Sequence, residues 1–284
     1  MKKITRGLAI IAALSSMLSA CLGIFYTSGG TARTVHNIYG QQVTLYGDGI
    51  YANNSLLKVG ATKGTDIVII ITGVILLALL LAFRNKKAGI FLQAGLLSII
   101  LYASTCLIMG VSFNQLFLLY TVQFGSSLFG FILSLQQILS TETYGEHVYD
   151  RHFRGTGIFL IISACSVLVW LMFILPAVIT GQPMETIEIY TTEPTFAIDL
   201  AIILPSAIFC GIALLKRKRI GYKVAPILLT LLAGVGICVI FQTVYQISLG
   251  IILPLGQLFG LVGSFIILGV FAVVLNIRLL RYAK

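Results

Sequence analysis

The chain has 284 residues and a mass of 30.8 kDa; 58% of its residues are hydrophobic and only 10% are charged. Soluble domains carry about 25% charged residues, so this composition and the mean hydropathy of +1.02 exclude a water-soluble globular protein. The 28 glycines show no collagen-like period, and five cysteines are too few for a disulfide scaffold. The sequence therefore predicts an all-α, multi-pass membrane protein.

Apolar runs predict the membrane crossings, because a helix needs about 20 mostly apolar residues to cross the hydrocarbon core. The sixth run is the shortest, and Pro205 should kink or loosen it, since proline cannot donate a hydrogen bond to the carbonyl of Ala201. The eight runs are Leu8–Tyr26, Ile67–Phe83, Gly89–Gly110, Leu116–Leu139, Gly157–Ile179, Leu200–Leu215, Val224–Tyr245 and Ile251–Ile277.

These crossings divide the chain into five parts. Residues 1–27 hold the first transmembrane helix, and 28–66 form an external β-rich segment. Residues 67–140 hold helices two to four, 141–156 form a cytoplasmic loop, and 157–284 hold helices five to eight.

Lysine and arginine predict the orientation. Of the 19 basic residues, only Arg33, Lys58 and Lys63 fall on the side opposite the N-terminus. The positive-inside rule then puts both termini in the cytoplasm and the protein in the cell membrane. This topology accounts for the net charge of +10 without a nucleic-acid partner. The basic run at 216–219 should instead attract anionic headgroups of the lipid bilayer.

The two halves of the chain share a layout. In each half an aspartate, Asp66 or Asp199, precedes an apolar run and a basic loop, at 84–89 or 216–222. Four helices per half make both halves enter the membrane in the same sense. We therefore expect a four-plus-four parallel repeat about an axis along the membrane normal.

The first external segment contains two β-rich runs, at 34–39 and 43–46, on either side of a turn with Gly40. Such a pattern predicts a β-hairpin. A lone hairpin is marginally stable in water, so it should pack on the membrane domain or on the acidic segment 181–196.

The N-terminus has two interpretations. Lys2 and Lys3, an apolar run and Leu18-Ser19-Ala20-Cys21 match a signal peptide that ends in a lipoprotein cleavage box, with Cys21 as the lipidated residue. The chain stays apolar as far as Tyr26, where a cleaved lipoprotein usually turns polar. We therefore expect residues 1–20 to be retained as part of a spanning helix.

Several separated segments carry a family resemblance. They are GQQVTLYGDGIYANNSLLKVGATKGTD at 40–66, FNQLFLLYTVQFGSSLFGFILSL at 113–135, and AIDLAIILP with LLKRKRIGY within 197–222. Together they resemble a family of prokaryotic multi-pass integral membrane proteins with no assigned activity. The resemblance implies the topology and lends no catalytic or binding residue.

Asp66 and Asp199 are the ionisable residues of greatest interest. Each is predicted at the outer start of a helix, where a carboxylate caps free backbone N–H groups and meets the positive end of the helix dipole. Acidic residues within spans otherwise mark ion, proton or ligand pathways. Capping is the favoured interpretation.

Polar side chains recur at helical spacing in the third, fourth and seventh helices. Such faces either join helices or line a cavity, and small uncharged residues favour the first role. The competing hypothesis is an outward-facing ligand pocket between the two halves. Its predicted residues are Asp66, Tyr102, Tyr120, Gln123, Asp199 and Gln242.

No motif predicts a catalytic residue, a metal or a cofactor. The loop 141–152 holds His147 and His152 among acids, but their spacing matches no established zinc pattern. All cysteines fall within spans without a CxxC pair, and the P-loop, GxSxG and HExxH motifs are missing.

Three classes of function remain open. The favoured class is a carrier-like or accessory membrane protein that binds a small solute or lipid at the predicted pocket. A structural or sensor protein that binds a partner through its external segment is the alternative. An intramembrane lipid-modifying enzyme ranks last, because no buried acid–base pair is evident. Neither an oligomer nor a partner subunit is excluded by the sequence.

Overall fold

The computed structural model describes residues 2–82, 87–142, 144–149 and 151–283. Within these ranges, eight helices are long and apolar enough to cross a membrane, in agreement with the eight predicted runs. They support a multi-pass membrane protein. The predicted basic residues Arg84 and Lys86, and Asp150 of the cytoplasmic loop, lie outside the described residues.

Five of the spanning segments are continuous α-helices and three contain irregular turns. The continuous helices are α1 (Lys2–Phe25), α2 (Leu56–Ala82), α3 (Lys87–Gly110), α4 (Phe117–Ser140) and α10 (Arg219–Ser248). The fifth span consists of α6 (Arg154–Ser166), η1 (Val167–Trp170) and α7 (Leu171–Thr180). The sixth consists of α8 (Pro194–Ile198), η3 (Asp199–Ile203) and α9 (Leu204–Leu215). The eighth contains η4 (Leu258–Val262) and α12 (Gly263–Leu280), and the short helices are α5 (Glu146–Tyr149), η2 (Glu185–Ile187) and α11 (Leu255–Gln257).

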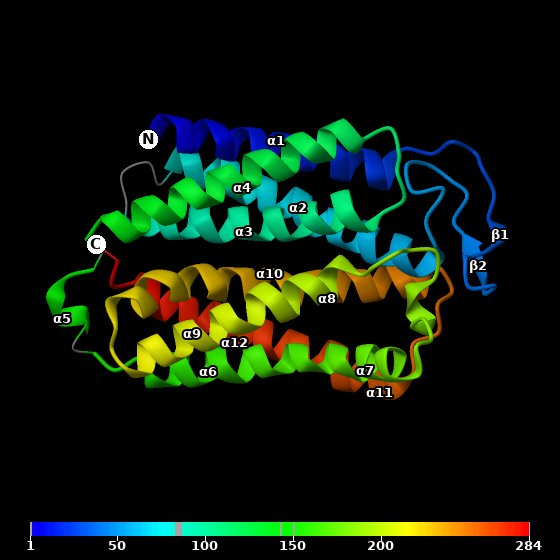
Figure 1. The fold of residues 1–284 in the computed structure, drawn as a ribbon. Coiled ribbons are helices and arrows are strands. Elements are labelled where there is room, and N and C mark those ends of the chain that lie inside the picture. Colours follow the sequence, from blue (N-terminus) through cyan, green and yellow to red (C-terminus); the bar gives the residue numbers. More distant parts are fainter. Residues whose placement is uncertain (1, 83–86, 143, 150, 284) are drawn as a thin grey trace.

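The helices form two groups that meet through α10 (Figure 1). In the first group, α1 packs against α2 and α4, and α3 packs against α4. In the second, α6 packs against α9, and α10 packs against α9 and α12. Helix α10 also packs along α2 and α3. Both chain termini lie at one end of the bundle, and the strands lie at the other, which we call the hairpin end (Figure 1).

Close packing of α2 on α10 depends on glycine. A Cβ atom at Gly64 would overlap the backbone of Gln242, and a Cβ at Gly60 would lie 2.7 Å from Gln246 Cγ. Large apolar side chains such as Leu81 and Phe209 point outward instead, with 76% and 60% of their surface exposed. An apolar exterior around a tightly packed interior is the arrangement expected in lipid.

The predicted hairpin is present as a small two-stranded sheet. Strand β1 (Arg33–His36) pairs antiparallel with β2 (Gln42–Leu45), and Gly40 has a φ of 80° in the connecting turn. The Asn37 side chain donates a 2.6 Å hydrogen bond to the Glu188 carbonyl oxygen. The hairpin thus contacts the segment between α7 and α8.

Two differences from the predicted helix starts change the position of the aspartates. Helix α2 begins at Leu56 and not at Ile67, and the sixth span begins at Pro194 and not at Leu200. Ser55 Oγ accepts a hydrogen bond from Lys58 N, and the Glu193 carboxylate accepts one from Thr195 N. Asp66 and Asp199 therefore lie within their helices and do not cap them. The apolar run missed the first turns of α2 because polar residues there, such as Thr62 and Lys63, are buried in protein.

Three turns of irregular helix occur in the second group. Segment η1 is a 3₁₀ turn, and η3 and η4 are π turns. Segment η3 ends at Ile203, and Pro205, which lacks a hydrogen-bond donor, lies in the first turn of the following helix α9, in keeping with the predicted loosening of this span. Single π turns are frequent at functional sites, which directs attention to the residues that these turns present.

Candidate functional site

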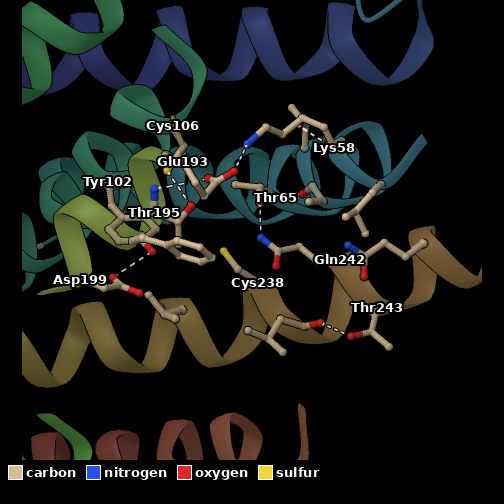
Figure 2. Close-up of a pocket in the computed structure, with 18 of the residues that line it drawn as sticks. Lys58, Thr65, Tyr102, Cys106, Glu193, Thr195, Asp199, Cys238, Gln242 and Thr243 are labelled. Atoms are coloured by element: carbon tan, nitrogen blue, oxygen red, sulfur yellow. Dashed lines mark hydrogen bonds and ion pairs between the residues drawn. The ribbon is translucent and has the colours of Figure 1, made fainter. Parts of the chain in front are cut away.

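A cavity of about 370 Å³ lies where α2, α3 and α10 meet the fifth and sixth spans. Small-molecule sites usually measure about 300–1,000 Å³ and combine apolar walls with a few polar groups. The side walls carry Ile69, Ile99 and Val235 as well as carboxylates and hydroxyls. Figure 2 shows the polar residues converging on this space from α2, α3, α8 and α10.

Asp199 is a buried carboxylate of this cavity, with 6% of its surface exposed. Its Oδ1 accepts a hydrogen bond of 3.1 Å from Tyr102 Oη on α3, and its Oδ2 accepts one of 2.8 Å from Trp170 Nε1. Because Trp170 ends η1 and Asp199 begins η3, two irregular turns present this pair. A smaller cavity of about 20 Å³, near the size of one water, adjoins Asp199 beside Ser163 and Ser166.

An aromatic wall stands next to Asp199. The rings of Trp170 and Phe196 stack with their centroids 4.8 Å apart, and Phe173 lies 6.4 Å from Phe196. All three rings line the cavity. Trp170 is the chain's single tryptophan, which makes it a spectroscopic probe of this site.

An ion pair lines the cavity nearer the start of α2. Lys58 Nζ lies 2.7 Å from Glu193 Oε2, and the two side chains are only 13% and 21% exposed. The Lys58 ammonium also lies 4.9 Å from the centroid of the Tyr190 ring. Partial burial and the aromatic contact reduce solvent screening of this pair relative to a surface salt bridge.

A segment of residues 184–193, here called the cover segment, borders the cavity at the hairpin end. Its Tyr190 hydroxyl accepts a 3.1 Å hydrogen bond from Ser55 N and donates one of 3.1 Å to Asn54 Oδ1. The Ser55 hydroxyl donates to the Glu188 carboxylate. Burial raises the pKa of Glu188, and the Ser55 hydrogen bond opposes this rise. Met184, Glu188 and Tyr190 all line the cavity.

The wall between α2 and α10 is held by uncharged polar groups. Gln242 Nε2 donates a 2.8 Å hydrogen bond to Thr65 Oγ1. Cys106 Sγ lies 3.7 Å from Thr195 Oγ1, and Cys238 stands on the α10 side (Figure 2). These groups offer hydrogen bonds and thiols without adding charge.

Four of the six predicted pocket residues line the cavity: Asp66, Tyr102, Asp199 and Gln242. Tyr120 and Gln123 do not, so this cavity is not bounded by all six predicted residues. The face of α4 that carries them packs on α1, where Ser19 Oγ donates a 2.7 Å hydrogen bond to Gln123 Oε1. Tyr120 lies in a buried cluster with Tyr51.

Asp66 holds a different position from Asp199, although the sequence layout pairs them. Its side chain is 1% exposed, and Oδ2 accepts a 2.8 Å hydrogen bond from Tyr51 Oη. A Cβ atom at Gly23 would lie 2.5 Å from the same Oδ2, so this carboxylate oxygen is packed against α1. Asp66 is therefore a packed part of the cavity wall. Asp199 is better placed than Asp66 to contact a ligand.

The predicted pocket omitted Trp170, Lys58, Glu188, Tyr190 and Glu193. Two signals were available: Lys58 is one of the few basic residues of the predicted outer side, and Trp170 is a lone indole within a span. Cys21 lies as a free thiol within the uninterrupted helix α1, and the expected retention of residues 1–20 stays a prediction.

Comparisons with protein-family models, with curated proteins and with solved structures found no match to this chain. A function must therefore be argued from the cavity. Among the residues that the structure describes, no group of three or more His, Cys, Asp or Glu side chains is arranged to hold a metal ion.

Proposed function

We propose that this protein is a carrier-like protein of the cell membrane that binds a small solute in the cavity between its two groups of helices. The observation that carries the proposal is the cavity itself, which combines apolar walls with the hydrogen-bonded carboxylate of Asp199. The solute enters from the hairpin end, where the cover segment lies.

The position of the cavity supports a carrier. Helices α2 and α3 come from the first half of the chain, and Trp170, Asp199 and α10 come from the second. Many transporters bind their substrate at the interface between two halves, and the predicted parallel repeat would make this cavity such an interface. Movement of one half against the other then changes access to the site.

Irregular helical turns give further support. Trp170, Asp199 and Val262 belong to η1, η3 and η4, and each of them lines the cavity. Interrupted helices at membrane depth are tolerated where they are buried in protein or border a cavity. In transporters such interruptions present polar groups to the substrate.

Charge supports the proposed orientation. Arg219, which pairs with Glu146 at 2.7 Å, belongs to the basic run 216–219 at the end where both termini lie (Figure 1). The hairpin end carries Arg33 and Lys58. Basic loops favour the cytoplasmic side, so we propose that both termini are cytoplasmic and the hairpin is external.

A cavity-filling variant tests the proposal. Ala61→Phe adds a ring inside the cavity, and Val74→Phe adds the same ring to the same helix at an outward position that is 52% exposed. Purified wild-type protein and both variants are screened for thermal stabilisation by a library of small solutes. Solutes that stabilise the wild type are then assayed for uptake into proteoliposomes.

The proposal predicts that some solutes stabilise the wild type and Val74→Phe but not Ala61→Phe. The same solutes should be taken up by proteoliposomes that contain the wild type or Val74→Phe, and not by those that contain Ala61→Phe. Solute binding that Ala61→Phe leaves intact would contradict the proposal, as would a library that stabilises none of the three proteins. A folded Ala61→Phe protein is verified by its elution profile and its unliganded melting temperature.

A second candidate, a partner-binding accessory protein, is favoured by the tip of the hairpin. Ile38 and Tyr39 are 85% and 47% exposed next to the turn at Gly40. An apolar tip on an external hairpin is suited to insertion into a partner's surface. Ile38→Asp should abolish such a complex and leave solute binding by the cavity unchanged.

A further inference from the structure

The residues that line the cavity include more acidic than basic side chains. Four carboxylates line it, from Asp66, Glu188, Glu193 and Asp199, whereas Lys58 is the cation among the described lining residues. The Lys58 charge is offset by Glu193 at 2.7 Å.

Lys63 offsets part of the excess of acidic over basic groups, but not all of it. Its position on α2 lets it offset the charge of Asp66, while its ammonium group contacts the ring and the hydroxyl of Tyr46. With that offset counted, Glu188 shares the charge of Lys58 with Glu193, and Asp199 has no cationic partner among the described residues. The lining of the cavity therefore holds more carboxylates than cations.

Asp199 is the carboxylate best prepared for a ligand. Its two hydrogen bonds come from neutral donors, the Tyr102 hydroxyl and the Trp170 indole, and each uses one of its oxygens. An ionised carboxylate offers about four acceptor sites, so both oxygens can accept a further donor. A buried carboxylate without a cation is costly, and a bound cation relieves that cost.

The surroundings of Asp199 select the kind of cation. Trp170, Phe173, Phe196 and Tyr102 line the same cavity, and aromatic faces attract ammonium groups, with tryptophan the strongest. Metal ions such as Ca²⁺ are held by several converging oxygen ligands, often carboxylates, and among the described residues no three His, Cys, Asp or Glu side chains form a group that could hold one. The aliphatic side chains of Ile69 and Ile99 offer contact to an apolar body.

We propose that the cavity binds an organic cation, a compound with one substituted ammonium group and an apolar body, whose nitrogen lies against the Asp199 carboxylate beside the aromatic wall. This inference rests on the proposed function, because it assigns a ligand class to the same cavity. An anionic solute is disfavoured, since Lys58 is already engaged by Glu193.

Three probes of one shape and different charge test the inference on the full-length protein: benzyltrimethylammonium, neutral benzyl alcohol and anionic phenylacetate. Binding is measured by equilibrium dialysis of radiolabelled probe against protein in detergent or nanodiscs. The wild type should bind benzyltrimethylammonium at least tenfold more tightly than either of the other probes. Equal or tighter binding of benzyl alcohol or phenylacetate overturns the inference.

Variants locate the cation. Asp199→Asn should weaken benzyltrimethylammonium binding at least tenfold, and Asp199→Glu should retain more affinity than the amide. Glu146→Gln is the matched control, since it removes an exposed carboxylate at the far end of the bundle, and it should leave binding unchanged. Unchanged binding by a folded Asp199→Asn protein overturns the assignment of the nitrogen to Asp199. The charge series on the wild type still decides the ligand class if that variant fails to fold.

The two proposals fail in different ways. Solutes whose binding is sensitive to Ala61→Phe but is tightest for neutral or anionic compounds would overturn the cation assignment and leave the solute cavity standing. Binding that is insensitive to Ala61→Phe for every probe overturns the solute cavity, and the cation assignment with it.

Discussion

Trp170 donates a hydrogen bond of 2.8 Å from its indole nitrogen to Asp199 Oδ2 and so connects the fifth and sixth spans inside the bundle. Tyr102 reaches the other oxygen from α3. One carboxylate therefore joins three spans at the wall of the cavity. Perturbation of this contact should affect both the packing of the helices and the site.

Tyr102→Phe should lower stability, because it removes one of the two donors to a buried carboxylate. Polar contacts between membrane helices contribute about 0.5–2 kcal/mol, and we expect a loss in that range, seen as a lower melting temperature. Tyr39→Phe, at an exposed hairpin position, is the control and should be neutral. In an Asp199→Asn background the cost of Tyr102→Phe should shrink; an undiminished cost would show that the hydroxyl acts elsewhere.

Gly64→Ala should destabilise the contact between the two groups of helices. The new Cβ would meet the backbone of Gln242, which cannot rotate away as a side chain can. Overpacking of this kind costs about 1–3 kcal/mol. Gly125→Ala is the matched control, since its Cβ would have no atom within 4 Å. Equal melting temperatures for the two variants would contradict the close packing of α2 on α10.

The docking of the cover segment should depend on pH through Glu188. Its folded pKa is raised above the ordinary value of 4.5 because it is buried, so the docked segment binds the proton more tightly than the open one. Stability from this group is therefore greatest below pH 4.5 and is lost as the pH rises through the raised pKa.

Thiol labelling measures this opening on a background in which the five native cysteines are replaced. A cysteine introduced at Met184 should be labelled faster as the pH rises, relative to the same cysteine in a Glu188→Gln protein. The ratio of the two rates removes the pH dependence of the thiol itself. A ratio that stays constant, or that falls with rising pH, would show that Glu188 does not control docking.

The proposed orientation predicts which cysteines an impermeant reagent can reach in intact cells. On the same cysteine-free background, Ser28→Cys at the hairpin end should be labelled from outside, and Lys218→Cys should be labelled only after the membrane is opened. Labelling at position 218 in intact cells would reverse the topology and place the cavity's covered end inside.

The eight spans and the hairpin were predictable because each follows from a local pattern: apolar length for the spans, and β-rich runs around Gly40 for the hairpin. The start of α2 was not, because the polar residues of its first turns, such as Lys58 and Thr62, face protein. A hydropathy pattern cannot distinguish such a turn from an external loop. The four-plus-four repeat and the family resemblance stay predictions.

The candidate site was predictable only in part for a related reason. The polar faces of α3, α4 and α10 are visible in the sequence, but the neighbour that each face meets is set by packing between distant segments. Gln123 thus meets Ser19 of α1, whereas Tyr102 meets Asp199. The position of the Trp170 side chain depends on the 3₁₀ turn η1, which ends at this residue. The local sequence contains no pattern that predicts this turn.

The central claim is that a solute occupies the cavity beside Asp199, and the fluorescence of Trp170 tests it most directly, because this is the chain's single tryptophan and it lines the cavity. Solutes that bind by dialysis are titrated into the wild type, Ala61→Phe and Val74→Phe while tryptophan emission is recorded. The account predicts a saturable change in the wild type and in Val74→Phe, at concentrations that match the dialysis affinity, and none in Ala61→Phe. Tryptophan emission that stays constant in the wild type while the solute binds would place the ligand outside the cavity and contradict the account.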